Sequence, residues 1–164
     1  MAEVHFIKEN DPFPNNSLLP IIIYHQIPGI NSVHEVKKML KENGWENSWV
    51  NGIFDYHHYH STAHEVLVVE KGQCEVQLGG DNMTSYKLKK GDAVVIPAGV
   101  AHKNLGSSSD FSCVGAYPKG QHYNINYGLP NERPKADEEI KRVPLPETDP
   151  IYGNTGPVVK YYKI

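Results

Sequence analysis

The sequence has few cysteines and no excess of basic residues. Its 164 residues include only Cys74 and Cys113, which are too few and too far apart for a disulfide framework or a zinc-thiolate cluster. Both are expected to be free thiols, and Cys74, which alternates with Val76 and Leu78, is expected to be a small buried hydrophobe. The formal net charge of -3 and the isoelectric point near 6.3 give no basic field for nucleic acid or an anionic membrane.

The sequence also lacks the motifs of several large functional classes. No apolar run approaches the length that spans a bilayer, and the first residues, MAEVHFIKENDPF, lack the basic and apolar regions of a secretory signal. A cytoplasmic location is therefore expected. There is no phosphate-binding loop, nucleophile elbow or basic recognition helix. No internal repeat is visible, and the length fits one domain with a full core.

Histidine, by contrast, is concentrated in one run, GIFDYHHYHSTAHEVLVVEKG, which contains His58, His60 and Glu65. Alternate side chains of a β-strand share a face, so His58 and His60 project together. Residues 65–69 are rich in β-branched side chains and predict a second strand that folds back beside the first. Two imidazoles and a carboxylate then converge. This donor set suits a divalent ion such as Fe, Mn, Ni, Zn or Cu.

A set of surface or hydrogen-bonded histidines without a metal is the alternative interpretation. The segment GDAVVIPAGVAH argues against it, because turns flank the short apolar strand 93–96 and His102 then opens a further strand as a fourth candidate ligand. His64 competes with Glu65 for the place of the acidic ligand. The two side chains lie on opposite faces of a strand, and the interval from Glu65 to the next glycine turn favours Glu65.

These segments resemble the two characteristic motifs of the cupins. The first motif, G(X)5HXH(X)4E(X)6G, is matched by Gly52, His58, His60, Glu65 and Gly72, and the second, G(X)5PXG(X)2H, by Gly91, Pro97, Gly99 and His102. The asparagine that usually follows the last histidine by four residues is displaced, since Asn104 follows His102 by two and Gly106 holds the usual place. This departure concerns strand packing more than the metal.

The wider stretches WENSWVNGIFDYHHYHSTAHEVLVV, GDAVVIPAGVAHKNLG and NYGLPNERPKADEEIKRVPLPETDPIYG resemble a narrower group, the YjlB-type cupins of microbes, which has no assigned reaction. The resemblance implies an all-β, RmlC-like double-stranded β-helix, a jelly-roll barrel, with a divalent metal held by His58, His60, Glu65 and His102. It implies no single chemistry, because cupins include dioxygenases, isomerases, decarboxylases, sugar epimerases and non-catalytic binders.

The chain divides into an N-terminal extension (1–51), a barrel core (52–117) and a C-terminal arm (118–164). In the extension, the apolar run 18–24 predicts a strand at a sheet edge or one that begins after Pro20, because proline cannot donate a ladder hydrogen bond. The arm is too apolar for a free linker and is expected to wrap the barrel.

Further elements are expected in the two flanking parts. Ser32 and Glu35 form a capping box for a helix that ends at Gly44. Trp45 and Trp49 follow and are expected to anchor this helix to the barrel rather than to stack on a substrate. In the arm, residues 135–142 could form one or two helical turns, and 158–164 could form a terminal strand.

Two classes of function fit these observations. An octahedral ion with four protein ligands keeps two positions for water, oxygen or substrate, so the first class is a metal-dependent enzyme, of dioxygenase or isomerase type, acting on a small oxygenated molecule. The second is a non-catalytic cupin that binds a small ligand or stores a metal. Further polar residues that could reach the barrel mouth are His64, Tyr86, Tyr117, His122, Tyr123 and Tyr127, and ordinary surface polar residues are an equally good interpretation of His64, Tyr86, His122 and Tyr123. A homodimer is expected, in which 18–24 adds to or covers a sheet edge of the partner.

Overall fold

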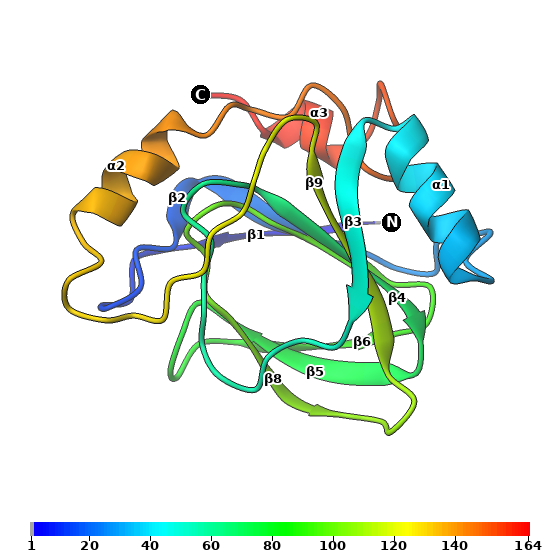
Figure 1. Ribbon diagram of the computed structural model, residues 1–164, viewed down its shortest axis with the longest axis horizontal. Helices are drawn as coiled ribbons and strands as arrows, with labels where there is room; N and C mark the ends of the chain where they lie inside the picture. The colour runs from blue at the N-terminus through cyan, green and yellow to red at the C-terminus, as the bar shows by residue number, and fades with distance from the viewer. Residues whose placement is uncertain (1) are drawn as a thin grey trace.

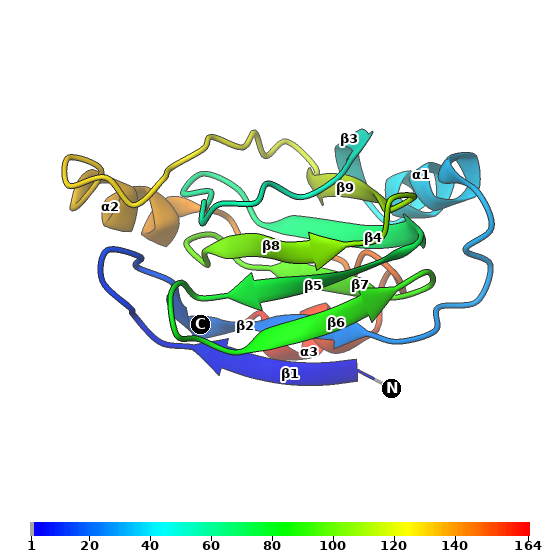
Figure 2. The same ribbon diagram turned by 90° about the horizontal axis from the view of Figure 1, so that it is seen from below.

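Two antiparallel sheets face each other in the computed structural model, which describes residues 2–164 (Figure 1). The larger sheet has the strand order β1-β2-β7-β4-β9-β3, and the smaller has the order β6-β5-β8 (Figure 2). The strands are β1 (Ala2–Ile7), β2 (Asn16–Tyr24), β3 (Trp45–Asn51), β4 (Glu65–Lys71), β5 (Gln73–Leu78), β6 (Ser85–Lys89), β7 (Ala93–Ile96), β8 (His102–Ser107) and β9 (Ser112–Pro118). The helices are α1 (Val33–Glu42), α2 (Lys135–Arg142) and α3 (Pro157–Tyr161). This is the all-β jelly-roll barrel that the sequence predicts.

Strand β4 lies inside the larger sheet and is buried on both faces. Leu67 and Val69 belong to the core between the two sheets, whereas Val66 and Val68 belong to the core on the other face, beneath α1. Burying each of these side chains contributes about 1.5–3 kcal/mol to folding. Because side chains alternate along a strand, Glu65 shares the inner face with Leu67 and is directed into the barrel.

The predicted helix of the extension is confirmed as α1. The Ser32 hydroxyl accepts a hydrogen bond from the Glu35 amide at 3.2 Å, as a helix cap does. Val36 and Leu40 are buried against the sheet. Gly44 follows the helix with φ +80°, a conformation that glycine adopts without strain and that turns the chain into β3.

Both alternatives predicted for the apolar run 18–24, an edge strand and a strand that begins after Pro20, were wrong, because β2 begins at Asn16 and lies inside the sheet. Strand β2 has β1 on one side and β7 on the other, and β1 was not identified from the sequence. Pro20 is tolerated because it lies outside both ladders. On one side the β1–β2 register shifts between His5 and Ile7, and on the other side β7 pairs only with residues 22–24. No ladder bond is therefore required from the proline nitrogen. The part of this run that pairs with both neighbours, residues 22–24, has no free edge for a strand of a second chain, and the predicted covering of a partner's sheet edge stays a prediction.

The sequence predicts that the segment 57–60 forms a strand beside β4, but the structure shows no such strand. The segment makes two single bridges instead, one between His58 and His102 and one between Tyr59 and Asn126. The physical reason is that β7 and β9 already fill both edges of β4. The segment is therefore fixed to the start of β8 and to the C-terminal arm.

The first part of the C-terminal arm passes the barrel opening, α2 lies at one end of the barrel, and the last part with α3 packs on the outer face of the larger sheet (yellow, orange and red in Figure 1). The helical prediction for 135–142 is confirmed by α2. The predicted strand at 158–164 was wrong, because α3 occupies Pro157–Tyr161. Proline suits the first turn of a helix, where its missing N–H would have no partner. Tyr162 follows α3 and donates a hydrogen bond to the Pro20 carbonyl at 2.8 Å, which joins the arm to β2.

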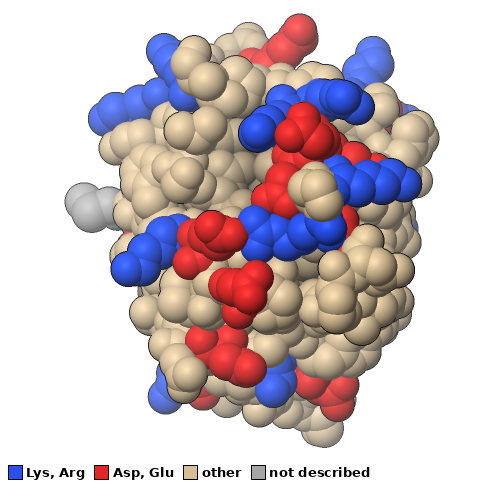
Figure 3. All heavy atoms as spheres, turned by 90° about the vertical axis from the view of Figure 1, so that its left-hand side faces the viewer, with Lys and Arg blue, Asp and Glu red and all other residues tan. Residues whose placement is uncertain are grey.

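The surface carries charges of both signs, and the two cysteines are unpaired. Figure 3 shows the face on the side of α2, where basic and acidic side chains are interspersed, as in the ion pair between Arg133 and Asp137 at 2.8 Å. Across residues 2–164, no helix combines the length and apolar character that crossing a membrane requires. Cys74 and Cys113 are free and buried, as predicted, and burial raises the pKa of the Cys74 thiol to about 12.

Candidate metal centre

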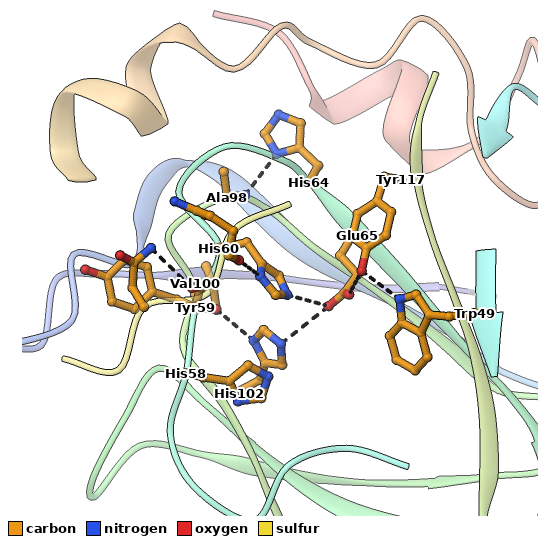
Figure 4. Close-up of polar contacts among 12 residues, drawn as sticks. Trp49, His58, Tyr59, His60, His64, Glu65, Ala98, Val100, His102 and Tyr117 are labelled. Carbon is orange, nitrogen blue, oxygen red and sulfur yellow. Dashed lines mark hydrogen bonds and ion pairs between the residues drawn. The ribbon is translucent and has the colours of Figure 1, made fainter. Parts of the chain in front are cut away.

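The structure brings three histidines together at the inner end of the barrel. His58 and His60 come from the irregular segment before β4, and His102 is the first residue of β8. One ring nitrogen of each lies within 4.8 Å of the others, and all three side chains are buried. Glu65, the first residue of β4, lies beside His60 and His102 but outside the three-histidine cluster (Figure 4). Its Oε1 atom lies 3.3 Å from His60 Nε2 and 3.4 Å from His102 Nε2.

Backbone carbonyls fix the orientation of the three imidazoles. The Nδ1 atoms of His58 and His102 each lie 3.0 Å from the carbonyl two residues earlier in the chain, and His60 Nδ1 contacts the carbonyl of Asn124. A carbonyl can only accept, so each Nδ1 carries the hydrogen and each Nε2 of a neutral ring presents its lone pair. This arrangement is how proteins orient histidines that bind a metal.

A chain of two hydrogen bonds, from Trp49 to Tyr117 and from Tyr117 to Glu65, fixes the orientation of the Glu65 carboxylate. Tyr117 donates a hydrogen bond to Glu65 Oε2 at 2.8 Å, and Trp49 Nε1 donates to the Tyr117 hydroxyl at 2.7 Å. The other oxygen, Oε1, faces the imidazoles and has no hydrogen-bond partner, although it is buried. The two short contacts to His60 and His102 therefore lack hydrogen-bond alignment. An orphaned buried carboxylate oxygen requires a cation beside it.

These observations fit a divalent ion. Ligands bonded at about 2.0–2.2 Å to one ion lie roughly 3 Å apart when they are neighbours, which agrees with the contacts of Glu65 Oε1. Lone pairs that face one another repel unless a cation lies between them. The three imidazoles form a possible site for such an ion, and the carboxylate of Glu65 lies beside two of them. Imidazole and carboxylate donors suit borderline and harder divalent metals.

A cavity of about 310 Å³ opens directly above the four side chains. Its wall is largely apolar and aromatic, and its floor consists of the candidate ligands. The remaining lining residues are Trp49, Val50, Asn51, Gly52, Ile53, Phe54, Leu67, Tyr117, Tyr123 and Ile125. A small molecule in the cavity would therefore contact the ion and the aromatic wall together.

The same part of the chain matches known proteins. Residues 49–114 match the family model described as Cupin domain. Over 161 residues the sequence is 39% identical to Uncharacterized protein YjlB of Bacillus subtilis (strain 168), a match that covers 98% of this chain and 96% of that protein. The chain belongs to the cupins. The full-length match to YjlB includes the N-terminal extension and the arm of this cupin.

Solved structures that are similar to this cupin are more distant. An acireductone dioxygenase from Bacillus anthracis, with a cadmium ion in its active centre, is 15% identical, has a TM-score of 0.44, and matches over 62% of this chain and 79% of its own. The epimerase RmlC from Legionella pneumophila Philadelphia 1 is 16% identical, has a TM-score of 0.40, and matches over 74% of both chains. No reaction transfers to this cupin at such similarity.

Burial and neighbouring charges set the ionisation of the centre of this cupin. Burial, followed by the repulsion of His102, lowers the pKa of His58 to about 3, so His58 stays neutral. Burial also acts to raise the pKa of Glu65, but the imidazoles of His60 and His102 outweigh it and hold that pKa well below its usual range. Burial acts to lower the pKa of His60, and the carboxylate of Glu65 outweighs it and raises that pKa. Glu65 is therefore ionised and needs a cation, either a proton on His60 or a metal ion.

The other polar residues predicted near the barrel mouth are divided between the cavity and its surroundings. His64 points to the opposite face of β4, where its Nδ1 accepts a hydrogen bond from the Ala98 amide at 2.9 Å (Figure 4). Tyr86 lies on β6 and outside the cavity, and His122 is exposed. Tyr117 and Tyr123 do line the cavity, whereas Tyr127 packs beside Tyr56.

Sequence reasoning missed the role of Trp49. It was assigned to anchoring α1, but only Trp45 is fully buried there, with Nε1 donating to the Thr148 carbonyl at 3.1 Å. Trp49 follows the register shift in the β3–β9 pairing and turns toward the cavity. Its ring lies over Gly115, where a Cβ atom would come within 2.2 Å of the indole. The spacing of the two tryptophans in the sequence does not reveal the register shift that separates their environments.

Proposed function

We propose that this cupin is a metal-dependent enzyme, of dioxygenase or isomerase type, that acts on a small oxygenated organic molecule. His58, His60, Glu65 and His102 would hold one divalent ion. The observation that supports this most strongly is the cluster of three buried histidine nitrogens, with the unpartnered Glu65 Oε1 beside two of them, in the lining of an open cavity. When bound, the ion would act as a Lewis acid toward an oxygen of the substrate.

The residues of the chain would divide the remaining tasks. Backbone carbonyls hold the imidazoles in the metal-binding tautomer, and Tyr117 keeps Glu65 turned toward the ion. Burial and the Glu65 charge raise the pKa of Tyr117, so its hydroxyl remains a hydrogen-bond donor. The apolar wall limits the number of water molecules near the reacting atoms, which strengthens electrostatic interactions there.

Metal analysis of protein purified without an affinity tag tests the first part of this proposal. We expect about one equivalent of a divalent ion per chain. With manganese supplied as the ion, the loaded protein should enhance water proton relaxation strongly, because the cavity gives solvent access to the ion. Protein that binds no divalent ion when Fe, Mn, Ni, Zn and Cu are each supplied would contradict the proposal.

A non-catalytic cupin that binds a small ligand or stores a metal is the second candidate. The buried and fully partnered Nδ1 atoms suit a stable metal site as well as a catalytic one. The open cavity favours the enzyme, because a storage site gains nothing from a space for an organic molecule. Each ligand that binds should be incubated with the metal-loaded protein in air and then analysed by mass spectrometry. If every ligand is recovered unchanged, the result favours a non-catalytic binding protein.

We also infer that the protein is a cytoplasmic homodimer. Strand β1 ends the larger sheet, and within residues 2–164 no strand pairs with its outer edge. Phe6 on β1 and Leu18 on β2 are 58% and 60% exposed, which a second copy could cover. Light scattering at micromolar concentration should give twice the chain mass, and replacing Phe6 by lysine should shift that mass toward the monomer. A monomer at every concentration would contradict the dimer, and cell fractionation tests the location.

A further inference from the structure

Two stacked aromatic pairs stand at the cavity, and Phe54 of the first pair and both tyrosines of the second line it. Phe54 and Tyr56 have ring centroids 5.0 Å apart with planes inclined by 13°, and the Phe54 ring meets the His58 ring edge to face at 5.1 Å. Tyr117 and Tyr123 have centroids 4.9 Å apart with planes inclined by 17°, and Tyr123 meets His60 at 5.3 Å. A flat ring above the histidines would thus meet aromatic side chains from both pairs.

Two of these rings are exposed although they stand at a cavity. Phe54 is 46% exposed and Tyr123 is 43% exposed. Large aromatic side chains usually gain their stability from burial, so exposed rings at the mouth of a cavity indicate surface that a ligand covers. Both also line the cavity that has the candidate metal ligands as its floor. The apolar part of the ligand therefore belongs between Phe54 and Tyr123.

Apart from the ion proposed at its floor, the cavity offers no cation for an anionic group. Within the described part of the chain, no lysine or arginine lines it, and Glu65 is its only acidic residue. A phosphate or carboxylate on the ligand would lose its hydration without gaining a cation from the wall. The hydroxyl of Tyr117 and the indole N–H of Trp49 are already used in the hydrogen bonds that support Glu65. A sugar with many hydroxyl groups would leave most of them without a partner.

We propose that the cavity binds an uncharged single-ring compound whose oxygen atoms are gathered at one edge, as in an ortho-diphenol. This inference rests on the proposed metal site, which would take the oxygen edge while Phe54 and Tyr123 contact the ring. The volume of about 310 Å³ lies at the lower end of the usual range for ligand sites and suits one ring. Sugar phosphates, nucleotides and dicarboxylates are disfavoured by the lining.

Calorimetry with zinc-loaded protein tests the class of ligand, because zinc does not oxidise the probes. The probes are catechol, 3,4-dihydroxybenzoate and glucose. The first two share the same pair of adjacent oxygens and differ in one carboxylate. We expect catechol to bind about tenfold or more tightly than dihydroxybenzoate, since no cation in the wall offsets the burial of the carboxylate. Glucose should give no measurable heat at the concentrations that saturate catechol.

Wall variants test the position of the ring. Phe54→Leu and Tyr123→Leu each remove one aromatic face from an exposed side chain, so both should fold and keep their zinc. Each should weaken catechol binding by about threefold to tenfold, the usual value of an aromatic contact. Phe6→Leu is the matched control, because Phe6 is also exposed but lies on β1, away from the cavity, and it should leave catechol affinity unchanged.

The zinc content, measured on each sample before calorimetry and after dialysis, separates the two proposals. Protein that retains neither zinc nor Fe, Mn, Ni or Cu supplied in its place would overturn the metal site, and the ligand class would fall with it. Zinc-loaded protein that binds dihydroxybenzoate or glucose as tightly as catechol would overturn the ligand class alone. Unchanged catechol affinity in both wall variants would do the same, whatever the affinity of the parent.

Discussion

Replacing Glu65 by glutamine is expected to lower the affinity for a divalent ion by about 100-fold or more while the barrel stays folded. Changes to side chains that only support a ligand already cost roughly 10- to 100-fold, and Glu65 would be a ligand itself. Glutamine keeps the size of the side chain and can still accept the hydrogen bond from Tyr117. It removes the only negative charge at the centre, and a divalent cation prefers an ionised oxygen.

His64→Gln is the matched control for this substitution. His64 is the preceding residue, it is equally buried, and its side chain points to the other face of β4. Glutamine can replace its acceptor role toward the Ala98 amide. Metal content and melting temperature of both variants should be compared with the parent at one pH and with the same metal supplied. Loss of the metal in the His64 variant, together with its retention in the Glu65 variant, would show that the ligand assignment is shifted by one residue.

The barrel core was predictable because its signals are local. Strands β4 and β7 follow from β-branched runs between glycine turns, and alternation along β4 correctly directs Glu65 into the barrel and His64 away from it. The two motifs then indicate which residues come together in the fold. His58 and His102 do so although they lie 44 positions apart in the sequence. The structure brings these residues together as a bridge between adjacent backbones.

The remainder depends on contacts that no local pattern encodes. The carbonyl of Asn124, which orients His60, belongs to the arm and uses no side-chain chemistry, so residue types give no sign of it. The edge strand β1 contains polar residues and is stabilised by its pairing with β2, which the sequence does not display. The terminal segment has the β-branched residues of a strand, but it forms α3 because of its proline and its place against β2.

One buried carboxylate, Asp149, contributes to the attachment of the arm to the barrel and to the arm's own fold. Asp149 is fully buried, and its Oδ2 accepts hydrogen bonds from the Tyr24 hydroxyl at 2.7 Å and from the Val158 amide at 3.0 Å. Its Oδ1 accepts from the amides of Ile151 and Tyr152 at 2.8 and 3.0 Å. Burial, followed by the Asp149 charge, raises the pKa of Tyr24, so its hydroxyl stays protonated and remains a donor.

Asp149→Ala should therefore destabilise the protein by about 3–5 kcal/mol, because it leaves four donors without their partner, the Tyr24 hydroxyl among them. For a chain of this length the melting temperature should fall by roughly 10 °C. Tyr24→Phe removes one of the four bonds and should cost about 1–2 kcal/mol. Asp81→Ala is the control, since its side chain is 83% exposed in a surface pair with His57 and should cost less than about 1 kcal/mol. Urea unfolding followed by circular dichroism measures all three. If Asp149→Ala costs no more than Asp81→Ala, the arm is held to the sheet by its apolar contacts and not by this carboxylate.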